Sequence, residues 1–218
     1  MTDQDLHEIM ALLTLASQEW VSPAVTIVSQ REENPFKVLI SCILSLRTQD
    51  RTTGSASERL FALAPDAETL ARLSPEIVER AIYPVGFYRT KAAQIIAIAC
   101  RLRDEFAGRV PDEIDELLTF KGVGRKTANL VVTLGYGKPG ICVDTHVHRI
   151  CNRLGYVTTR TPDKTETALR SKLPTEYWLV INDLLVMCGQ NLCLPVSPRC
   201  SICPVAQLCA RNDVERSR

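Results

Sequence analysis

The feature that most constrains this chain is a short glycine-bearing turn between two apolar helical runs. Apolar residues recur at helical spacing over residues 114–120 before the turn and over residues 128–134 after it. Only Gly122-Val123-Gly124 is left at the bend, and glycine tolerates positive φ angles and close backbone approach. The sequence therefore predicts a helix–hairpin–helix at about residues 112–136. The second helix would begin with unpaired backbone N–H groups, which suit a phosphate.

The rest of the chain also has helical patterns. Pro35 suits the first position of a helix running to Leu46, and Gly155 suits the end of one that Asp144 caps. The other predicted helices are one from Pro75 to Tyr83, one over 91–106, one capped by Asp112, and two that begin at Pro162 and Pro174. Only residues 24–28 resemble a strand, and a single strand cannot build a sheet. The predicted fold class is all-α.

Charge is unevenly distributed along the chain. The formal net charge is +1, yet residues 121–160 contain seven Lys or Arg against one acid, Asp144. The window holds Lys121, Arg125, Lys126, Lys138, Arg149, Arg153 and Arg160. We expect a basic face that binds a polyanion, with an ordinary solvated face as the alternative.

The N-terminus predicts neither a signal peptide nor a membrane anchor. Residues 1–5 are acidic and lead into an amphipathic helix, and no charge-free apolar run approaches the ~18 residues that span a bilayer. We therefore expect a cytoplasmic protein without membrane contact. Nine cysteines are then unusual, because structural disulfides are rare in a reducing compartment.

Four of those cysteines form a compact array near the C-terminus. Cys193, Cys200, Cys203 and Cys209 are separated by six, two and five residues, and intervening prolines favour loops. Four thiolates suit either zinc or an iron–sulfur cluster, and the spacing alone does not separate the two. The five others are interpreted as buried thiols in apolar helices: Cys42, Cys100, Cys142, Cys151 and Cys188.

Three motifs together resemble one known family. They are Gly122-Val-Gly-Arg-Lys-Thr-Ala-Asn129, Val143-Asp144-Thr145-His146, and the cysteine array over 193–209. In order and spacing they resemble endonuclease III, a family of bifunctional DNA glycosylases of the helix–hairpin–helix superfamily. The resemblance extends from about residue 34 to residue 209.

The resemblance implies a fold, a cofactor and an activity. The fold would have two helical lobes flanking a DNA-binding cleft. A six-helix barrel would span residues 28–138, and a cluster domain would combine residues 1–27 and 139–218. The cysteine array would hold one 4Fe–4S cluster. The activity would be removal of oxidised pyrimidines from double-stranded DNA, coupled to AP-lyase cleavage at abasic sites, by a monomer.

The same resemblance assigns roles to individual residues. Lys126 would attack the sugar and form a Schiff base, and Asp144 would stabilise the developing sugar charge. We expect Lys126 to be partly buried. The residues that would contact DNA are Lys121, Gly122, Val123, Gly124, Arg125, Thr145 and His146. His146 on a helix surface could equally be a structural residue. Taken alone, Lys126 would more simply be a phosphate contact or a solvated charge, and Asp144 an N-cap.

The chain departs from the family pattern at three places. Phe120-Lys121 replaces Leu-Pro before the first glycine, Arg47 replaces a glutamine that probes the DNA gap, and Phe87 replaces a leucine wedge. Asp50 matches a family aspartate that can contact DNA, although capping the next helix is its simplest role. These changes bear on lesion preference and on opposite-base contacts.

Two other functions are compatible with parts of the pattern. One is a mismatch-specific adenine or thymine glycosylase, although those enzymes generally lack a lysine at the position of Lys126. The other is a non-catalytic DNA-binding or redox-sensing cluster protein, for which Lys126 and Asp144 would be incidental. Lys121 is a rival nucleophile by proximity, but it does not match the family position.

Overall fold

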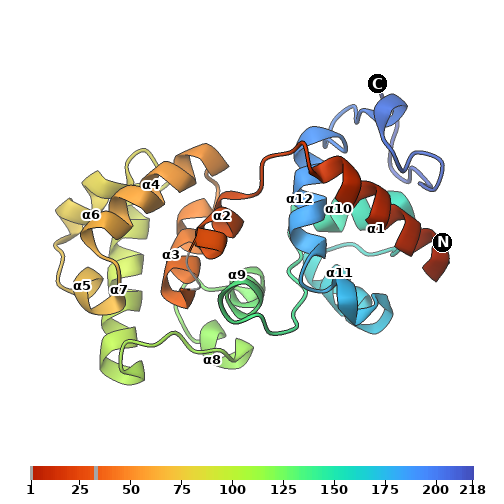
Figure 1. Cartoon of the computed structure of the whole chain (residues 1–218). Coiled ribbons are helices and arrows are strands. Elements are labelled where there is room, and N and C mark those ends of the chain that lie inside the picture. Colours follow the sequence, from red (N-terminus) through yellow and green to blue (C-terminus); the bar gives the residue numbers. More distant parts are fainter. Residues whose placement is uncertain (1, 32–33) are drawn as a thin grey trace. The chain divides into compact units, whose positions relative to one another are not determined.

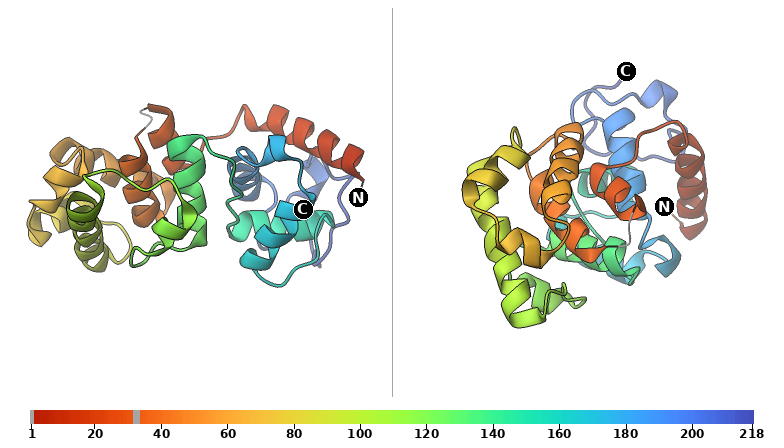
Figure 2. Two further views of the ribbon diagram at one scale, coloured as in Figure 1. Left: turned by 90° about the horizontal axis from the view of Figure 1, so that it is seen from below. Right: turned by 60° about the vertical axis from the view of Figure 1, so that its left-hand side comes forward.

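The computed structural model describes residues 2–31 and 34–218, and every regular element within them is helical (Figure 1). The further views of Figure 2 likewise contain no strand in that part of the chain. The predicted all-α class is therefore confirmed. None of these helices combines the length and apolar character that crossing a membrane requires.

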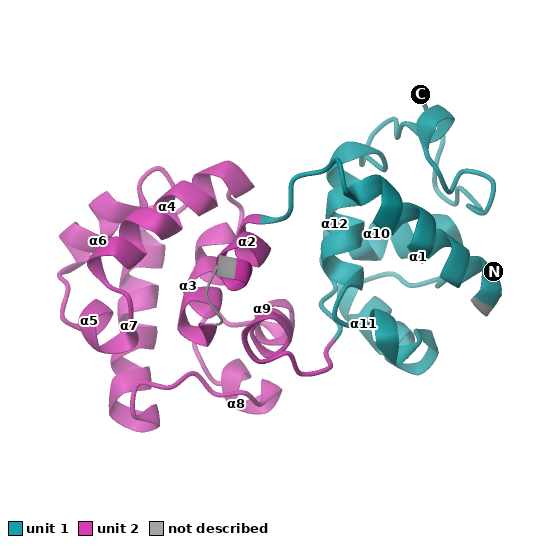
Figure 3. Ribbon diagram, in the orientation of Figure 1, with its two compact units in different colours: residues 1–23, 141–218 teal, residues 24–140 magenta. Residues whose placement is uncertain are grey.

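The chain divides into two compact units (Figure 3). The first unit combines residues 1–23 and 141–218, and the second unit comprises residues 24–140. The resemblance to endonuclease III implied boundaries at 28 and 138. The first of them lies earlier in the structure because residues 24–31 form a helix of the second unit.

The second unit is built around one buried helix, α3 (Pro35–Ser45). Asn34 caps α3 by accepting hydrogen bonds from the Phe36 and Lys37 amides, and Pro35 opens it as predicted. Packed with it are α2 (Ala24–Arg31), α4 (Asp50–Leu63), α5 (Ala67–Ala71), α6 (Pro75–Ile82), α7 (Tyr88–Phe106), α8 (Ile114–Leu118), α9 (Arg125–Leu130) and the π-helical turn η1 (Val131–Gly135). Within α3 every residue from Val38 to Leu44 is buried, so it forms the unit's core.

The strand predicted over residues 24–28 is wrong, because these residues begin α2. Val, Thr and Ile favour strands locally, but this preference is weak and burial readily overrides it. Ala24, Val25 and Thr26 are buried, and α2 packs against α3 and α4. Tertiary packing therefore determines the conformation of this segment.

The first unit has its own core, formed by segments from both ends of the chain. It contains α1 (Asp3–Ser17), α10 (Thr145–Leu154), α11 (Pro162–Lys172), the 3-10 turn η2 (Thr175–Tyr177), α12 (Ile181–Asn191) and the 3-10 turn η3 (Cys200–Ile202). Leu6, Ile9 and Leu13 of α1 are buried in one cluster with Leu184 and Leu185 of α12. The N-terminal helix is thus part of the unit that carries the cysteine array.

Three helix starts differ from the predictions. Pro174 precedes only the single turn η2, and the long helix that follows begins at Ile181. The helix predicted over 91–106 begins earlier, at Tyr88. Asp112 does not cap the first hairpin helix: Glu113 holds the N-cap position of α8, and the Asp112 carboxylate instead pairs with Lys138 Nζ at 2.8 Å. This long-range ion pair is not visible in local sequence.

Candidate active site and cysteine pocket

The predicted hairpin is formed by the segment between α8 and α9. Gly122 has φ +82°, a left-handed conformation that favours glycine, whereas Gly124 is the N-cap of α9 with φ −96°. Phe120 is only 1% exposed and anchors the turn in the core. On the outer side, Gln94 Nε2 donates a hydrogen bond to the Lys121 carbonyl at 3.0 Å and lies where a Cβ on Gly122 would collide with it.

Replacing Gly122 with alanine is therefore expected to destabilise the protein, whereas Gly124→Ala is a matched control. An L-residue in the left-handed region costs roughly 1–2 kcal/mol, and the added Cβ would also displace Gln94. A Cβ on Gly124 meets nothing within 4 Å. Chemical denaturation of both variants would measure the difference. Equal free energies of unfolding would contradict this account of the turn.

Lys126 is the second residue of α9, directly after the hairpin. Its side chain is exposed, so the expectation of partial burial is wrong. The ammonium group nevertheless acts on α3: burial raises the pKa of the Cys42 thiol to about 12, and the charge of Lys126 opposes that rise. The N-cap of α9 is Gly124, which has no side chain to cap the helix, and amides at a helix N-terminus suit a bound anion.

Asp144 caps α10 as predicted. Its Oδ1 atom accepts hydrogen bonds from the His146 amide at 2.8 Å and the Val147 amide at 2.9 Å. The cap therefore holds a half-buried carboxylate in a fixed orientation at the start of α10.

The two residues after Asp144 have different environments. Thr145 is exposed at the start of α10. His146 is half-buried, and its ring lies so close to α12 that a Cβ on Gly189 would collide with it. Its Nδ1 also lies 3.1 Å from Nη2 of Arg149, which donates to the Cys193 carbonyl at 2.7 Å. These contacts give His146 a structural role within the first unit.

Arg47 and Phe87 lie in two connections of the second unit, and both have left-handed backbones with φ +53° and +59°. The Arg47 guanidinium lies 5.9 Å from the centre of the Phe87 ring, within cation–π range. Phe87 is 63% exposed. Asp50 is not the cap of the following helix, since Gln49 holds that position and Asp50 is the first residue of α4.

The basic window 121–160 does not form one basic face. Arg153 is only 7% exposed and Arg149 is half-buried. Lys138 is engaged by Asp112 and Glu113, and hydrogen bonds to these carboxylates raise the pKa of Lys138 to about 12. Lys121, Arg125 and Lys126 are exposed around the hairpin, so this part of the window offers three cations to an anion.

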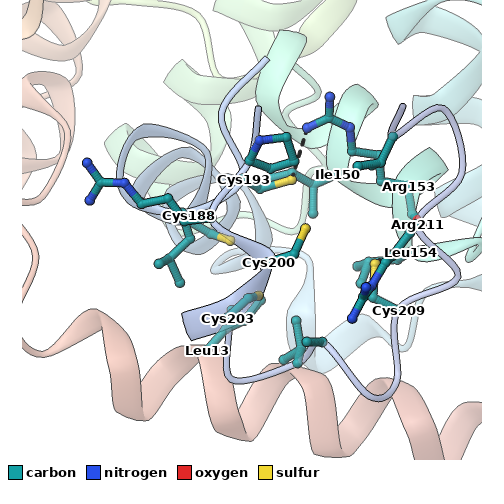
Figure 4. Close-up of a pocket in the computed structure, with 16 residues that line it drawn as sticks. Leu13, Ile150, Arg153, Leu154, Cys188, Cys193, Cys200, Cys203, Cys209 and Arg211 are labelled. Atoms are coloured by element: carbon teal, nitrogen blue, oxygen red, sulfur yellow. Dashed lines mark hydrogen bonds between the residues drawn. The ribbon is translucent and has the colours of Figure 1, made fainter. Parts of the chain in front are cut away.

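The four cysteines of the array line one pocket of the first unit (Figure 4). Apolar side chains also line it: Leu13 from α1, Ile150 and Leu154 from α10, and Leu192 directly after α12. Arg153 supports the loop from α10, because its Nη1 donates to Cys193 Sγ at 3.4 Å and to the Leu194 carbonyl at 2.7 Å. Its Nη2 donates to the Pro195 carbonyl at 2.8 Å. Sequence reasoning missed this role of Arg153.

The donor set of the pocket fits an iron–sulfur cluster. Cysteine thiolates are the usual ligands of such clusters. The four cysteines of the array line one pocket whose wall is largely apolar. The pocket therefore offers the number and type of ligands that a cluster needs.

The remaining cysteines are mostly buried thiols, as predicted. Cys42, Cys142, Cys151 and Cys188 are buried, whereas Cys100 is half-buried and Cys142 lies outside any helix. Burial raises the pKa of Cys151 to about 12. Cys188, on α12, also lines the pocket of the array. Its position in the sequence, five residues before Cys193, does not indicate that it lines this pocket.

Comparison with known proteins identifies the family. Residues 40–175 match the HhH-GPD superfamily of base excision DNA repair proteins, and residues 193–209 match the iron–sulfur binding domain of endonuclease III. The chain is 46% identical to endonuclease III of Thermotoga maritima over 83% of this chain and 85% of that protein. It is 41% identical to endonuclease III-like protein 1 of Mus musculus over 80% of this chain, but spans only 59% of the mouse protein.

Solved structures agree with this result. A trapped endonuclease III–DNA covalent intermediate has a TM-score of 0.83 at 31% identity, covering 97% of both chains. A thermostable thymine-DNA glycosylase has a TM-score of 0.81 at 21% identity, covering 96% of both chains, which shows the shared fold alone. The chain therefore belongs to the endonuclease III family of the HhH-GPD superfamily, and it is a base-excision DNA glycosylase with AP-lyase activity that carries one 4Fe–4S cluster.

Proposed function

We propose that this protein removes oxidised pyrimidines from double-stranded DNA and cleaves the resulting abasic sites, with Lys126 as the nucleophile and Asp144 as its partner. The observation that carries the proposal is the position of Lys126, on the first turn of the helix that follows the hairpin. The same hairpin offers backbone amides and exposed cations for a phosphate. A relative of 31% identity has been trapped as a covalent intermediate with DNA, which is consistent with nucleophilic chemistry.

The chemistry requires the damaged nucleotide to leave the base stack, because its glycosidic bond is inaccessible inside the duplex. The neutral Lys126 amine would attack C1′ of the sugar, and the base would depart with the electron pair of the broken C1′–N bond. Proton loss from nitrogen and opening of the sugar ring would give the Schiff base. Removal of a C2′ proton would then break the C3′–O bond and cut the strand by β-elimination.

Asp144 suits the electrostatic part of this reaction. Breaking the glycosidic bond develops positive charge on the sugar, which a carboxylate stabilises. The cap bonds at Oδ1 hold the Asp144 carboxylate in orientation without a conformational change. We therefore assign Asp144 to stabilising that charge and to assisting proton transfer.

The DNA contacts are proposed at the hairpin and at the exposed residues Arg47 and Phe87. The amides of Gly122, Val123 and Gly124, with Lys121 and Arg125, would hold phosphates. Arg47 and Phe87 would fill the stack vacated by the flipped nucleotide, as apolar wedges do in other DNA-bending proteins. Thr145 is exposed for a further contact, whereas the contacts of His146 within the first unit favour a structural role.

The cluster ligands are proposed to be Cys193, Cys200, Cys203 and Cys209, and the first unit, residues 1–23 and 141–218, would then form the cluster domain. When bound, the cluster would supply four iron–thiolate bonds that fold the loop over 193–209. Arg153 would hold the Cys193 end of that loop through its bonds to Leu194 and Pro195. That the protein acts as a monomer, in the cytoplasm of a prokaryote, stays a prediction.

Trapping the intermediate tests the proposed function. The protein would be incubated with a duplex oligonucleotide containing thymine glycol, reduced with borohydride and digested, and the modified lysine located by mass spectrometry. We expect the adduct on Lys126. An adduct on Lys121 would contradict the assignment of the nucleophile. Failure of the wild-type protein to form any adduct, on thymine glycol or on an abasic site, would contradict the proposed chemistry.

A further inference from the structure

A buried lysine lies beneath the exposed pair Arg47 and Phe87. Lys91 is on the first turn of α7 and is only 4% exposed. Its ammonium donates hydrogen bonds to the Leu44 carbonyl at 2.8 Å, the Leu46 carbonyl at 2.5 Å and Thr48 Oγ1 at 3.1 Å. All three acceptors belong to the end of α3 and the connection that follows. Lys91 thus bonds the chain on both sides of Arg47, through the Leu46 carbonyl before it and the Thr48 side chain after it.

The same connection is tied to the segment that precedes α7. The Gly86 amide donates to Thr48 Oγ1 at 3.2 Å. A Cβ on Gly86 would lie 2.6 Å from the Arg47 carbonyl, so only glycine allows the two backbones to approach this closely. Thr48 therefore accepts from both Lys91 and Gly86, and it joins the segment of Arg47 to the segment of Phe87.

The backbones of Arg47 and Phe87 require such support. Neither residue is glycine, yet both are left-handed, a conformation that costs each of them free energy. Strained backbones of this kind persist only where surrounding contacts determine them. Here those contacts are made by Lys91, Thr48 and Gly86, which hold the Arg47 guanidinium over the Phe87 ring before any DNA is present.

We propose that Lys91 is a positioning residue that, through Thr48 and Gly86, holds Arg47 and Phe87 in the geometry needed to fill the gap in duplex DNA. This inference rests on the proposed function of that pair. A preformed wedge avoids the entropy cost of ordering two connections during binding. Lys91 itself touches no DNA in this account. It therefore matters on duplex substrates, where a stack must be filled, and much less on single strands.

The variant Lys91→Met removes the three hydrogen bonds but keeps an unbranched apolar stem. Its free protein is expected to show faster hydrogen exchange at the Gly86 amide, a measurement that needs no DNA. The ratio of borohydride trapping on duplex to trapping on single-stranded abasic DNA is expected to fall about tenfold. Thr48→Val, which retains the ammonium, is expected to lower the same ratio by a smaller factor and serves if Lys91→Met folds poorly.

Leu70→Ala is the matched control. Leu70 is fully buried on α5, which packs against α7, so its truncation destabilises the same helix without touching either connection. We expect Leu70→Ala to have the same ratio of duplex to single-strand trapping as the wild-type protein. The inference is wrong if Lys91→Met and Thr48→Val keep the wild-type ratio, or if Leu70→Ala lowers it equally. If the wild-type protein formed no adduct on either duplex or single-stranded DNA, the proposed function would be contradicted instead. Hydrogen exchange at the Gly86 amide would still test whether Lys91 holds the two connections together.

Discussion

Lys126→Gln is expected to abolish borohydride trapping and to slow base removal by at least about 10³-fold, or about 4 kcal/mol of transition-state stabilisation. Glutamine is an unbranched residue with a helix propensity similar to that of lysine, but its side chain has no nucleophilic amine. Because the Lys126 side chain is exposed, the change leaves no cavity and the fold is retained. Gel-shift titration would use a duplex with a non-cleavable abasic analogue. DNA affinity is expected to stay within about threefold of wild type, since the variant loses only one positive charge that can contact a phosphate.

Lys121→Gln is the matched control for this experiment. It removes an exposed positive charge five residues away, at the entrance to the hairpin. We expect it to weaken binding in a salt-dependent manner while the adduct still forms. An adduct of undiminished yield with Lys126→Gln, or its loss with Lys121→Gln alone, would overturn the assignment.

Cys203→Ala is expected to remove the cluster and with it the fold of the first unit. A structural metal centre can contribute on the order of 10 kcal/mol to folding, which is comparable to the whole stability of a domain, about 5–15 kcal/mol. The second unit has its own core around α3, so its helices are expected to persist. Iron content and absorbance near ~400 nm would measure the loss of the cluster. Circular dichroism would measure the loss of helix.

Cys188→Ala provides a control inside the same pocket. Cys188 lines that pocket from α12 and is buried, but it lies outside the array. This variant is expected to keep both its iron and its colour, and to lose only the small free energy of one truncated side chain. Loss of iron from Cys188→Ala, or full iron retention in Cys203→Ala, would show that the ligand set is different.

The sequence predicted best what depends on near neighbours. The hairpin turn follows from glycine at 122, and the start of α10 follows from a carboxylate at 144 that caps amides two and three residues away. Each of these features is decided within a few residues. The cysteine array also lies within a single loop, and comparison with known proteins supplied the cluster that spacing left open.

Features that depend on distant partners could not be predicted in this way. Lys91 and Leu44 are 47 positions apart, and Arg153 and Leu194 are 41 apart. In the sequence both cations resemble ordinary surface charges, because long charged side chains are rarely buried. Only the carbonyl groups that the fold gathers around them make burial possible. The strand predicted over residues 24–28 is wrong for the same reason, since the conformation of these residues depends on α3 and α4.

The division of the first unit between the two ends of the chain has a consequence for biosynthesis. Residues 24–140 are synthesised as one continuous stretch and can fold before the C-terminal segment emerges from the ribosome. Helix α1 is made before this stretch, whereas its partner α12 and the loop over 193–209 are made after it. The apolar face of the nascent helix α1 therefore stays uncovered until α12 has been synthesised. The core of the first unit can form only after residues 24–140 have been made.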